Sequence, residues 1–282
     1  NVAYALVGAA RRIAGDWEQA ESLQLRGVTL NRAIGDIWEE GLGLMNLAIM
    51  WRIRGYHARA MELHARIMSL GNGTEQHLYL GEALVCDGLC LGEQGRLEEG
   101  LARLEQALAQ SGLNLLGRVR AIAHRGWLRY LQGDAAAGLL DLEDAHTQIR
   151  SRRMAGEHIT EILLWRCEAM ISAGASIWEV RGALLRAARA GNRLPAFRGS
   201  VQFVRGLLEA RQGQRRRAAR RFAMAVEMHR ALDRGQEAAR ALLWQAEMMP
   251  DRAGALIREA ERLIRVRSGR WPLMGGPPGN LA

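Results

Sequence analysis

The chain has 282 residues, a length that would ordinarily correspond to two compact domains of about 100 to 200 residues each. All 39 of its basic side chains are arginines, and the formal net charge is +9. Because lysine is absent, this sequence cannot hold a phosphate-binding loop lysine, a pyridoxal Schiff base or a kinase strand lysine. With 49% hydrophobic residues and only 5 prolines, it is expected to fold around a long helical core.

A glycine recurs along the chain at intervals of 38 to 41 residues, at Gly15, Gly55, Gly95, Gly133, Gly174 and Gly213. A small residue stands seven residues before each of them, and another stands five residues after most of them. Glycine can adopt the left-handed conformation that ends a helix, and small flanking residues let two helix backbones approach closely. The pattern therefore predicts helix hairpins, and Ala246 continues the small-residue series into a last unit.

Within each predicted hairpin the apolar residues follow the helical period, as in Leu101, Leu104 and Leu108. One hairpin cannot bury such a stripe alone, whereas a stack of hairpins can. We therefore expect an all-α, right-handed superhelical solenoid of about seven antiparallel hairpins. Their expected ranges are 1–34, 36–71, 74–111, 114–151, 156–190, 195–231 and 234–267. We treat residues 1–267 as one elongated solenoid domain and the Pro- and Gly-containing residues 268–282 as a tail or linker.

The first unit places Gly8, Gly15, Trp17 and Ala20 at a spacing that resembles the tetratricopeptide repeat. That repeat has 34 residues, and the longer units here resemble the sensor superhelix of MalT-type large ATP-binding transcriptional activators. In that family the superhelix binds an inducer or an inhibitory protein, between an ATP-binding module and a DNA-reading helix-turn-helix. The resemblance implies a non-enzymatic sensor or interaction module, the regulatory domain of a larger bacterial transcriptional regulator. The family's ATPase residues have no counterpart in this sequence.

Four positions beside each small packing residue, at offsets of −6, −3, +1 and +4, should line the concave side of the solenoid. Apolar residues alternate there with aromatic rings and charges, and an arginine can grip a carboxylate or phosphate with two hydrogen bonds. We expect this stripe to bind a peptide, a protein or a small-molecule effector; the alternative is that it packs as core. The expected groove residues are Arg52, Arg120, Trp127, Tyr130, Glu161, Glu168 and Phe203.

Charge is distributed unevenly, since residues 1–141 carry a net −2 and residues 142–282 a net +11. The densest basic patch consists of Arg211, Arg215, Arg216, Arg217, Arg220 and Arg221. It could contact an acidic neighbouring domain, nucleotide phosphates or nucleic acid, or it could simply be a solvated face. Direct nucleic-acid binding is disfavoured, because no helix-turn-helix pattern and no aromatic interleaving accompany the arginines.

Three cysteines favour buried thiols in a reducing compartment over a disulfide framework. Cys86 and Cys90, like His57 and His64, lack further ligands at metal-binding spacing, so no metal or cofactor is expected. No apolar run reaches the roughly 18 residues needed to cross a membrane, and we expect a soluble, cytoplasmic protein. The first residue is not Met, which fits a segment of a longer chain. A structural scaffold for protein assembly is the main alternative to a sensor module.

Overall fold

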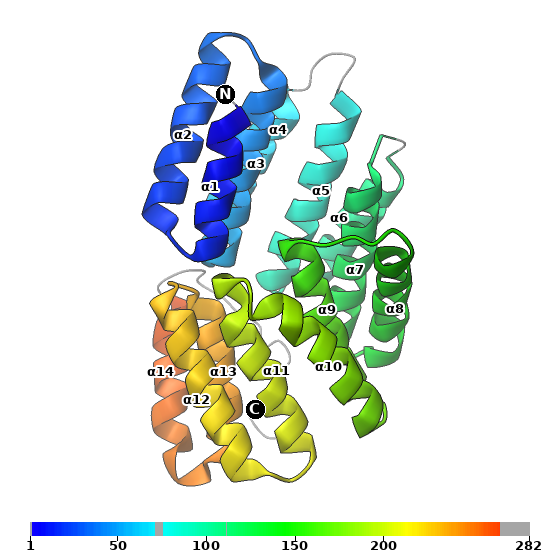
Figure 1. Cartoon of the computed structure of the whole chain (residues 1–282), viewed down its shortest axis with the longest axis vertical. Helices are drawn as coiled ribbons and strands as arrows, with labels where there is room; N and C mark the ends of the chain where they lie inside the picture. The colour runs from blue at the N-terminus through cyan, green and yellow to red at the C-terminus, as the bar shows by residue number, and fades with distance from the viewer. Residues whose placement is uncertain (1, 71–75, 111, 266–282) are drawn as a thin grey trace. The chain divides into compact units, whose positions relative to one another are not determined.

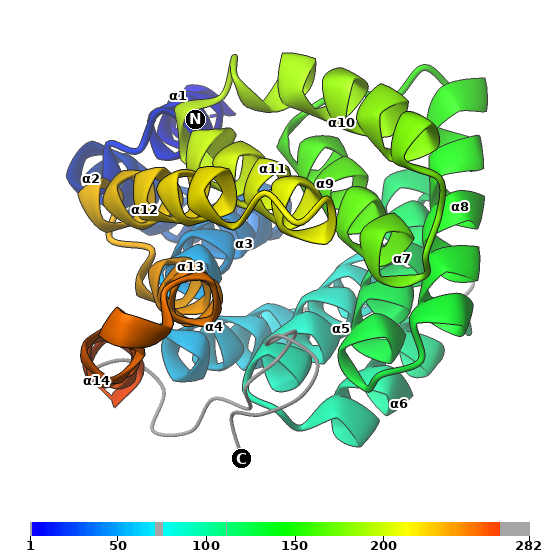
Figure 2. The same cartoon turned by 90° about the horizontal axis from the view of Figure 1, so that it is seen from below.

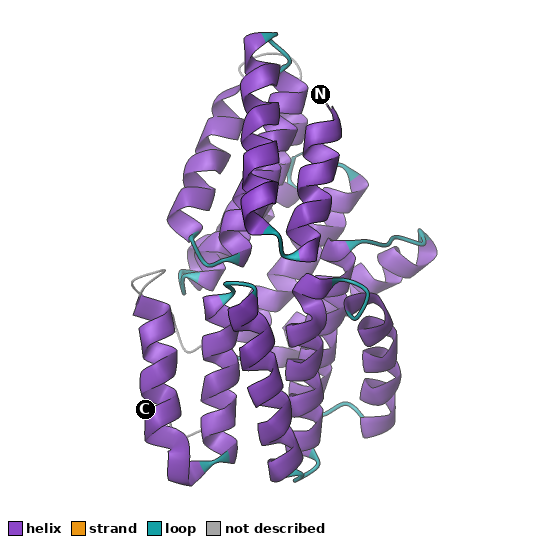
Figure 3. Cartoon of the chain, turned by 60° about the vertical axis from the view of Figure 1, so that its left-hand side comes forward, coloured by secondary structure: helices purple, strands orange, loops and turns teal. Residues whose placement is uncertain are grey.

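The computed structural model describes residues 2–70, 76–110 and 112–265, which form α-helices and two short 3-10 helices and contain no strand (Figures 1 and 3). The helices pair as the sequence predicts, and the fold is an α-solenoid of helix hairpins. In chain order they are α1 (Val2–Ala14), α2 (Trp17–Ala33), α3 (Ile37–Ile53), α4 (His57–Leu70), α5 (Gln76–Glu93), α6 (Leu97–Leu108), α7 (Leu115–Leu131), α8 (Ala135–Ser151), α9 (Glu157–Ser172), α10 (Ile177–Gly191), α11 (Arg198–Arg211), α12 (Arg215–Ala231), α13 (Gly235–Met248) and α14 (Ala253–Arg265). The 3-10 helices are η1 (Pro195–Phe197) and η2 (Pro250–Arg252).

The six repeating glycines all end the first helix of a hairpin in the left-handed conformation, with φ between 73° and 95°. At two of these turns the residue after the glycine caps the second helix with its side chain. Asp16 accepts a hydrogen bond from the backbone N–H of Gln19 at 3.3 Å, and Asp134 accepts one from Ala137 at 2.9 Å. Each cap satisfies an N–H group that the helix itself leaves unpaired. At these turns, the glycine that ends the first helix and the aspartate that caps the second are therefore adjacent in the sequence.

The small residues permit close helix crossings, as the interval pattern predicts. A Cβ atom added at Gly138 of α8 would lie 2.6 Å from the carbonyl oxygen of Gly126 in α7. One added at Gly88 of α5 would lie 2.9 Å from the carbonyl oxygen of Gly100 in α6. No real Cβ tolerates such distances to backbone, so glycine is required at these crossings.

The chain divides into two compact units, residues 1–124 and 125–282, with the division inside α7. Within each unit, hairpins stack in the same manner. In the first unit α1 contacts α3, and α2 contacts both of them; in the second unit α11 contacts α13, and α12 contacts both of them. Figures 1 and 2 show α11, α12, α13 and α14 side by side in the second unit. The assignment of residues 1–267 to a single domain stays a prediction, and the tail 268–282 lies outside the described residues.

Each unit has its own apolar core. In the first, Leu44, Met50 and Ile67 are buried between α3 and α4. In the second, Phe222 and Leu242 are buried within a cluster that extends from α9 to α14. The three cysteines are buried free thiols, as expected. Among the described residues, no helix combines the length and apolar character required to cross a membrane.

Candidate functional site

Four of the expected groove residues converge on one arginine in the second unit. Trp127 and Tyr130 come from α7, Glu168 from α9 and Phe203 from α11. All four are buried, and they interact around Arg240 of α13. We call these five residues the Arg240 cluster. Consecutive odd-numbered helices thus each contribute a side chain to it.

The Arg240 guanidinium lies between aromatic rings and a carboxylate. Its Cζ atom is 4.5 Å from the ring centroid of Phe203 and 5.2 Å from that of Trp127. Its Nη1 donates to Oε1 of Glu168 at 3.4 Å, and its Nη2 pairs with Oε2 of the same carboxylate. Arginine is suited to this position, because it can stack on rings and bind a carboxylate through two nitrogens at once.

The aromatic part of the cluster extends to a tryptophan outside the predicted stripe. Trp127 stacks on Tyr130 at 5.1 Å and on Trp165 at 5.1 Å, the two tryptophan rings being only 8° from parallel. The Tyr130 hydroxyl forms a hydrogen bond with Ser172 at 3.3 Å. These buried, stacked rings form a rigid apolar wall beside Arg240.

Burial perturbs the ionisable groups of the cluster. It raises the pKa of Glu168 above its usual value, against the opposing charge of Arg240. Burial alone would lower the pKa of Arg240, but the negative charge of Glu168 reverses this effect and raises it. Arg240 therefore remains a cation, and its side chain, 13% exposed, is more accessible than that of Glu168, at 5%.

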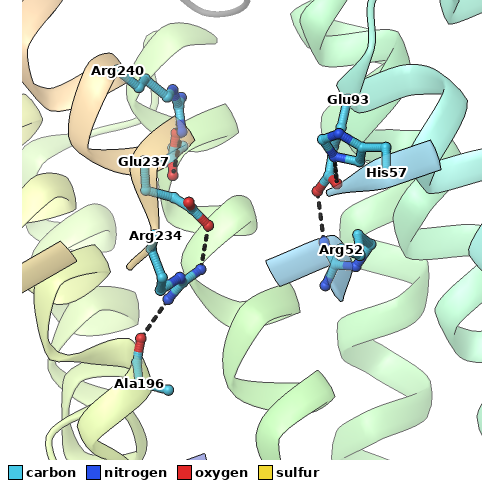
Figure 4. Close-up of polar contacts among 8 residues, drawn as sticks. Arg52, His57, Glu93, Ala196, Arg234, Glu237 and Arg240 are labelled. Atoms are coloured by element: carbon cyan, nitrogen blue, oxygen red, sulfur yellow. Dashed lines mark hydrogen bonds and ion pairs between the residues drawn. The ribbon is translucent and has the colours of Figure 1, made fainter. Parts of the chain in front are cut away.

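A second polar group lies in the first unit, where Glu93 of α5 accepts hydrogen bonds from two other helices. Arg52 of α3 donates to it at 2.6 Å and His57 of α4 lies 3.0 Å from its other oxygen (Figure 4). Arg52 and His57 are both buried. One carboxylate therefore connects three helices, and it is shared by Arg52 and His57, whose positions in the sequence do not relate them to each other.

Arg120 of α7, another expected groove residue, is buried beside two residues of α5. Its Nη1 donates to Glu82 at 2.6 Å and its Nη2 donates to Sγ of Cys86 at 3.2 Å. Although burial raises the pKa of Cys86, the charge of Arg120 and the neighbouring His64 outweigh it and lower the pKa below its usual value. His64 in turn lies 2.7 Å from Asp87 through its Nδ1 atom. These buried groups form a connected network between α4, α5 and α7.

His64 makes the first unit sensitive to alkaline pH. Burial lowers its pKa, but the hydrogen bond to Asp87 and the interaction with Cys86 outweigh burial and raise it to about 9. The folded state thus retains a proton that the unfolded state, with a histidine pKa near 6.5, releases. This contribution to stability is fully present below pH 6.5 and is lost as the pH rises to about 9. The lowered pKa of the adjacent Cys86 has the opposite effect on stability as the pH rises. We therefore expect the free energy of unfolding to fall by less than the roughly 3 kcal/mol that His64 alone would give.

Urea denaturation followed by circular dichroism at pH 6, 7.5 and 9 measures this loss. The His64→Gln variant should be less stable at pH 6 and should lack most of the decrease, because glutamine does not titrate. A decrease of the same size in His64→Gln would assign the pH dependence to another group.

The remaining predicted residues do not join the Arg240 cluster. Arg52 and Arg120 belong to the first unit, and Glu161 is half-buried on α9. Arg211, Arg215, Arg216, Arg217 and Arg220 of the basic patch are exposed, whereas Arg221 is half-buried. Arg221 pairs with Glu209 at 3.2 Å, and Arg215 donates to the backbone carbonyl of Glu247 at 2.7 Å. A ligand-binding role for the groove residues and for the basic patch stays a prediction.

Arg240 was missed by sequence reasoning although a signal for it exists. It stands six residues before Ala246, so the −6 offset used for the other units identifies it once the stripe is extended to the last hairpin. Trp165 occupies none of the chosen offsets, and no sequence signal singles it out. Arg234 is also buried; it bonds Glu237 three residues on and the Ala196 carbonyl, and the contact with Ala196 spans 38 residues that no spacing connects (Figure 4).

No known family model matches the sequence, and no curated protein matches it. Solved structures are similar to the chain in fold. The Rap conjugation gene regulator of plasmid pLS20 in complex with the Phr* peptide has a TM-score of 0.72 at 11% identity, covering 93% of this chain and 76% of that chain. A Rap protein complexed with Competence and Sporulation Factor has a TM-score of 0.69 at 11% identity, with the same coverage. A tetratricopeptide repeat protein from Parabacteroides merdae ATCC 43184 has a TM-score of 0.44 at 14% identity, covering 92% and 97%. At these identities, the two Rap structures show that the chain is similar in fold.

Proposed function

We propose that the chain is a non-enzymatic regulatory module that binds a peptide through the Arg240 cluster. The supporting observation is the convergence of side chains from α7, α9, α11 and α13 on one partly exposed arginine. Two structures of similar fold are complexes, one of them with the Phr* peptide. A peptide carboxylate would share Arg240 with Glu168, and an apolar side chain would pack beside the aromatic rings.

Binding would act by shifting the solenoid between two arrangements of its hairpins. Each hairpin contacts only its neighbours, so small changes at successive interfaces add along the stack. A ligand shifts such an equilibrium only by its difference in affinity for the two states. A peptide bound across four odd-numbered helices would favour the arrangement in which those helices are correctly spaced.

We further propose that the module belongs to a larger bacterial transcriptional regulator and works in the cytoplasm. The unit length of about 40 residues supports the former, and three buried free thiols fit the reducing compartment. The alternatives are a scaffold for protein assembly and a solenoid that binds nucleic acid through the basic patch. Exposure of five of its six arginines makes that patch available to an acidic partner.

Affinity selection from a library of short peptides with free carboxylates, read by mass spectrometry, tests the proposal. The enriched peptide is then titrated calorimetrically into the chain and into Arg240→Ala, at a temperature at which circular dichroism shows that the variant is folded. We expect the substitution to weaken binding by about a hundredfold, as for a buried charged pair in an interface. Arg258→Ala, which removes an exposed arginine of α14, is the matched control and should leave the affinity unchanged.

The proposal is wrong if no peptide is enriched or if the two variants bind it equally well. Titration with random duplex DNA at low salt serves as a further arm of the experiment. Binding there that weakens steeply with added salt would support the nucleic-acid alternative instead.

A further inference from the structure

The second unit contains a cavity that is separate from the Arg240 cluster. It has a volume of about 410 Å³ and lies between α8, α9 and α10, the second helix of one hairpin and both helices of the next. Its apolar lining includes Leu139, Met170 and Trp178, and its charged lining includes Arg166 and Arg186. The volume falls within the range of sites that bind small ligands and peptide side chains.

The tryptophan at the cavity is exposed to an unusual extent. Trp178 is 78% accessible, the highest value among the exposed large hydrophobic residues described. It is the second residue of α10, a helix that begins one residue later, relative to its turn glycine, than the second helices of the other hairpins with a turn glycine. The Arg181 guanidinium lies 5.4 Å from its ring centroid. Large apolar groups that remain exposed beside a cavity are characteristic of interaction sites, where tryptophan is enriched.

A glycine in the middle of α10 keeps the cavity open. A Cβ atom at Gly182 would meet only Nη1 of Arg186, at 3.8 Å, which is ordinary van der Waals contact. Helix packing therefore does not require glycine here, in contrast to Gly126 and Gly138. Glycine within a helix costs roughly 0.5 to 1 kcal/mol relative to alanine. Its presence leaves room for a ligand against the helix backbone.

The charges around the cavity favour an anionic ligand. Both carboxylates are already engaged: Glu143 pairs with Arg166 at 2.7 Å, and Glu179 forms the capping box with Ser176. Two donors remain without a partner among the described residues, the exposed Arg186 side chain and Nε of the buried Arg166. Hydrogen-bonding capacity on these two arginines is therefore left over for a carboxylate.

A neighbouring histidine lies close to the same charges. His146 of α8 lies 3.6 Å from Glu143. Its pKa is lowered by burial first and by the charge of Arg166 second, against the opposing charge of Glu143, and Arg150 and Arg186 add smaller lowering contributions.

We propose that this cavity is a docking site for an acidic peptide segment of a partner protein. A bulky apolar side chain of the segment enters between Leu139, Met170 and Trp178, and an adjacent Asp or Glu carboxylate pairs with Arg186. The site is independent of the Arg240 cluster, so the protein can hold a partner through α8 and α10 while its odd-numbered helices bind an effector.

The test uses the chain labelled with 5-fluorotryptophan, in which the Trp178 signal is assigned by Trp178→Phe. The probe is the peptide acetyl-Gly-Glu-Phe-Glu-Leu-Gly-amide, and its counterpart carries Lys in place of each Glu. We expect a saturable shift of the Trp178 fluorine signal with the acidic peptide and binding at least about tenfold weaker with the basic one. Gly182→Met, which fills the cavity floor, should abolish the shift.

Arg186→Glu and Arg189→Glu form a matched pair, since both reverse an exposed arginine of α10 but only the first lines the cavity. Arg186→Glu should weaken the acidic peptide by about tenfold, while Arg189→Glu should leave its affinity unchanged within error. Circular dichroism melting confirms that both variants fold. The proposal is overturned by the absence of a saturable Trp178 shift, by equal effects of the two variants, or by a shift that follows protein concentration alone, which would assign the cavity to a second copy of the chain.

Discussion

Gly138→Ala should lower the free energy of unfolding by about 3 kcal/mol, even though alanine is the better helix former. The added Cβ would lie 2.6 Å from the Gly126 carbonyl oxygen and 2.8 Å from the backbone nitrogen of Tyr130. Both are backbone atoms, so α7 and α8 must move apart, and Tyr130 of the Arg240 cluster moves with them. Guanidinium denaturation followed by circular dichroism measures the loss.

The same substitution at Gly182 is the control for Gly138→Ala. It introduces an identical methyl group into the middle of a neighbouring hairpin's helix, but into open space. Gly182→Ala should therefore raise stability by about 0.5 to 1 kcal/mol. Equal stability of the two variants would contradict the close crossing of α7 and α8.

Breaking the ion pair between Glu168 and Arg240 should destabilise the second unit by about 3 to 5 kcal/mol. Glu168→Ala leaves the largely buried guanidinium without its carboxylate, and Arg240→Ala leaves a buried carboxylate without its guanidinium. In Glu168→Ala the cation would remain between Trp127 and Phe203, where the rings offset only part of its desolvation cost. Thermal unfolding monitored by calorimetry measures both effects.

A double variant separates the cost of an unpaired charge from the contribution of the pair itself. Glu168→Leu with Arg240→Met replaces both charges by apolar groups of similar length and should restore stability to within about 1 to 2 kcal/mol of the parent. If the double variant instead loses as much stability as the two single variants together, the residues do not interact as the structure indicates.

Local features of the fold could be read from the sequence, because each hairpin is specified within its own residues. The positive φ of Gly15 and Gly133 and the caps formed by Asp16 and Asp134 follow from residue types within a few positions of each turn. The small residues at Gly126 and Gly138 identify a close crossing without any knowledge of the remaining chain.

Side-chain partners distant in sequence could not be predicted in the same way. Arg240 bonds Glu168 across 72 residues, and Arg52 bonds Glu93 across 41. Such pairings depend on the rotation between successive hairpins, which the 40-residue period does not specify. The stripe offsets placed Trp127, Glu168 and Phe203 on one face, but which residues meet depends on stacking geometry.

The exposure of Trp178 could not be predicted from the sequence either. Helical spacing shows on which face of its helix a residue lies. It does not show whether another helix covers that face. The cavity beside Trp178 arises because Gly182 and Ala175 are small, and their effect is visible only once α8 and α10 are placed around α9.

Hydrogen–deuterium exchange of the chain, with and without the peptide selected from the free-carboxylate library, tests the central proposal most directly. If the peptide binds at the Arg240 cluster, exchange should slow in the odd-numbered helices α7, α9, α11 and α13 and stay unchanged in α8, α10 and α12. Arg240→Ala should remove that protection. Protection confined to even-numbered helices, or protection that persists in Arg240→Ala, would contradict it.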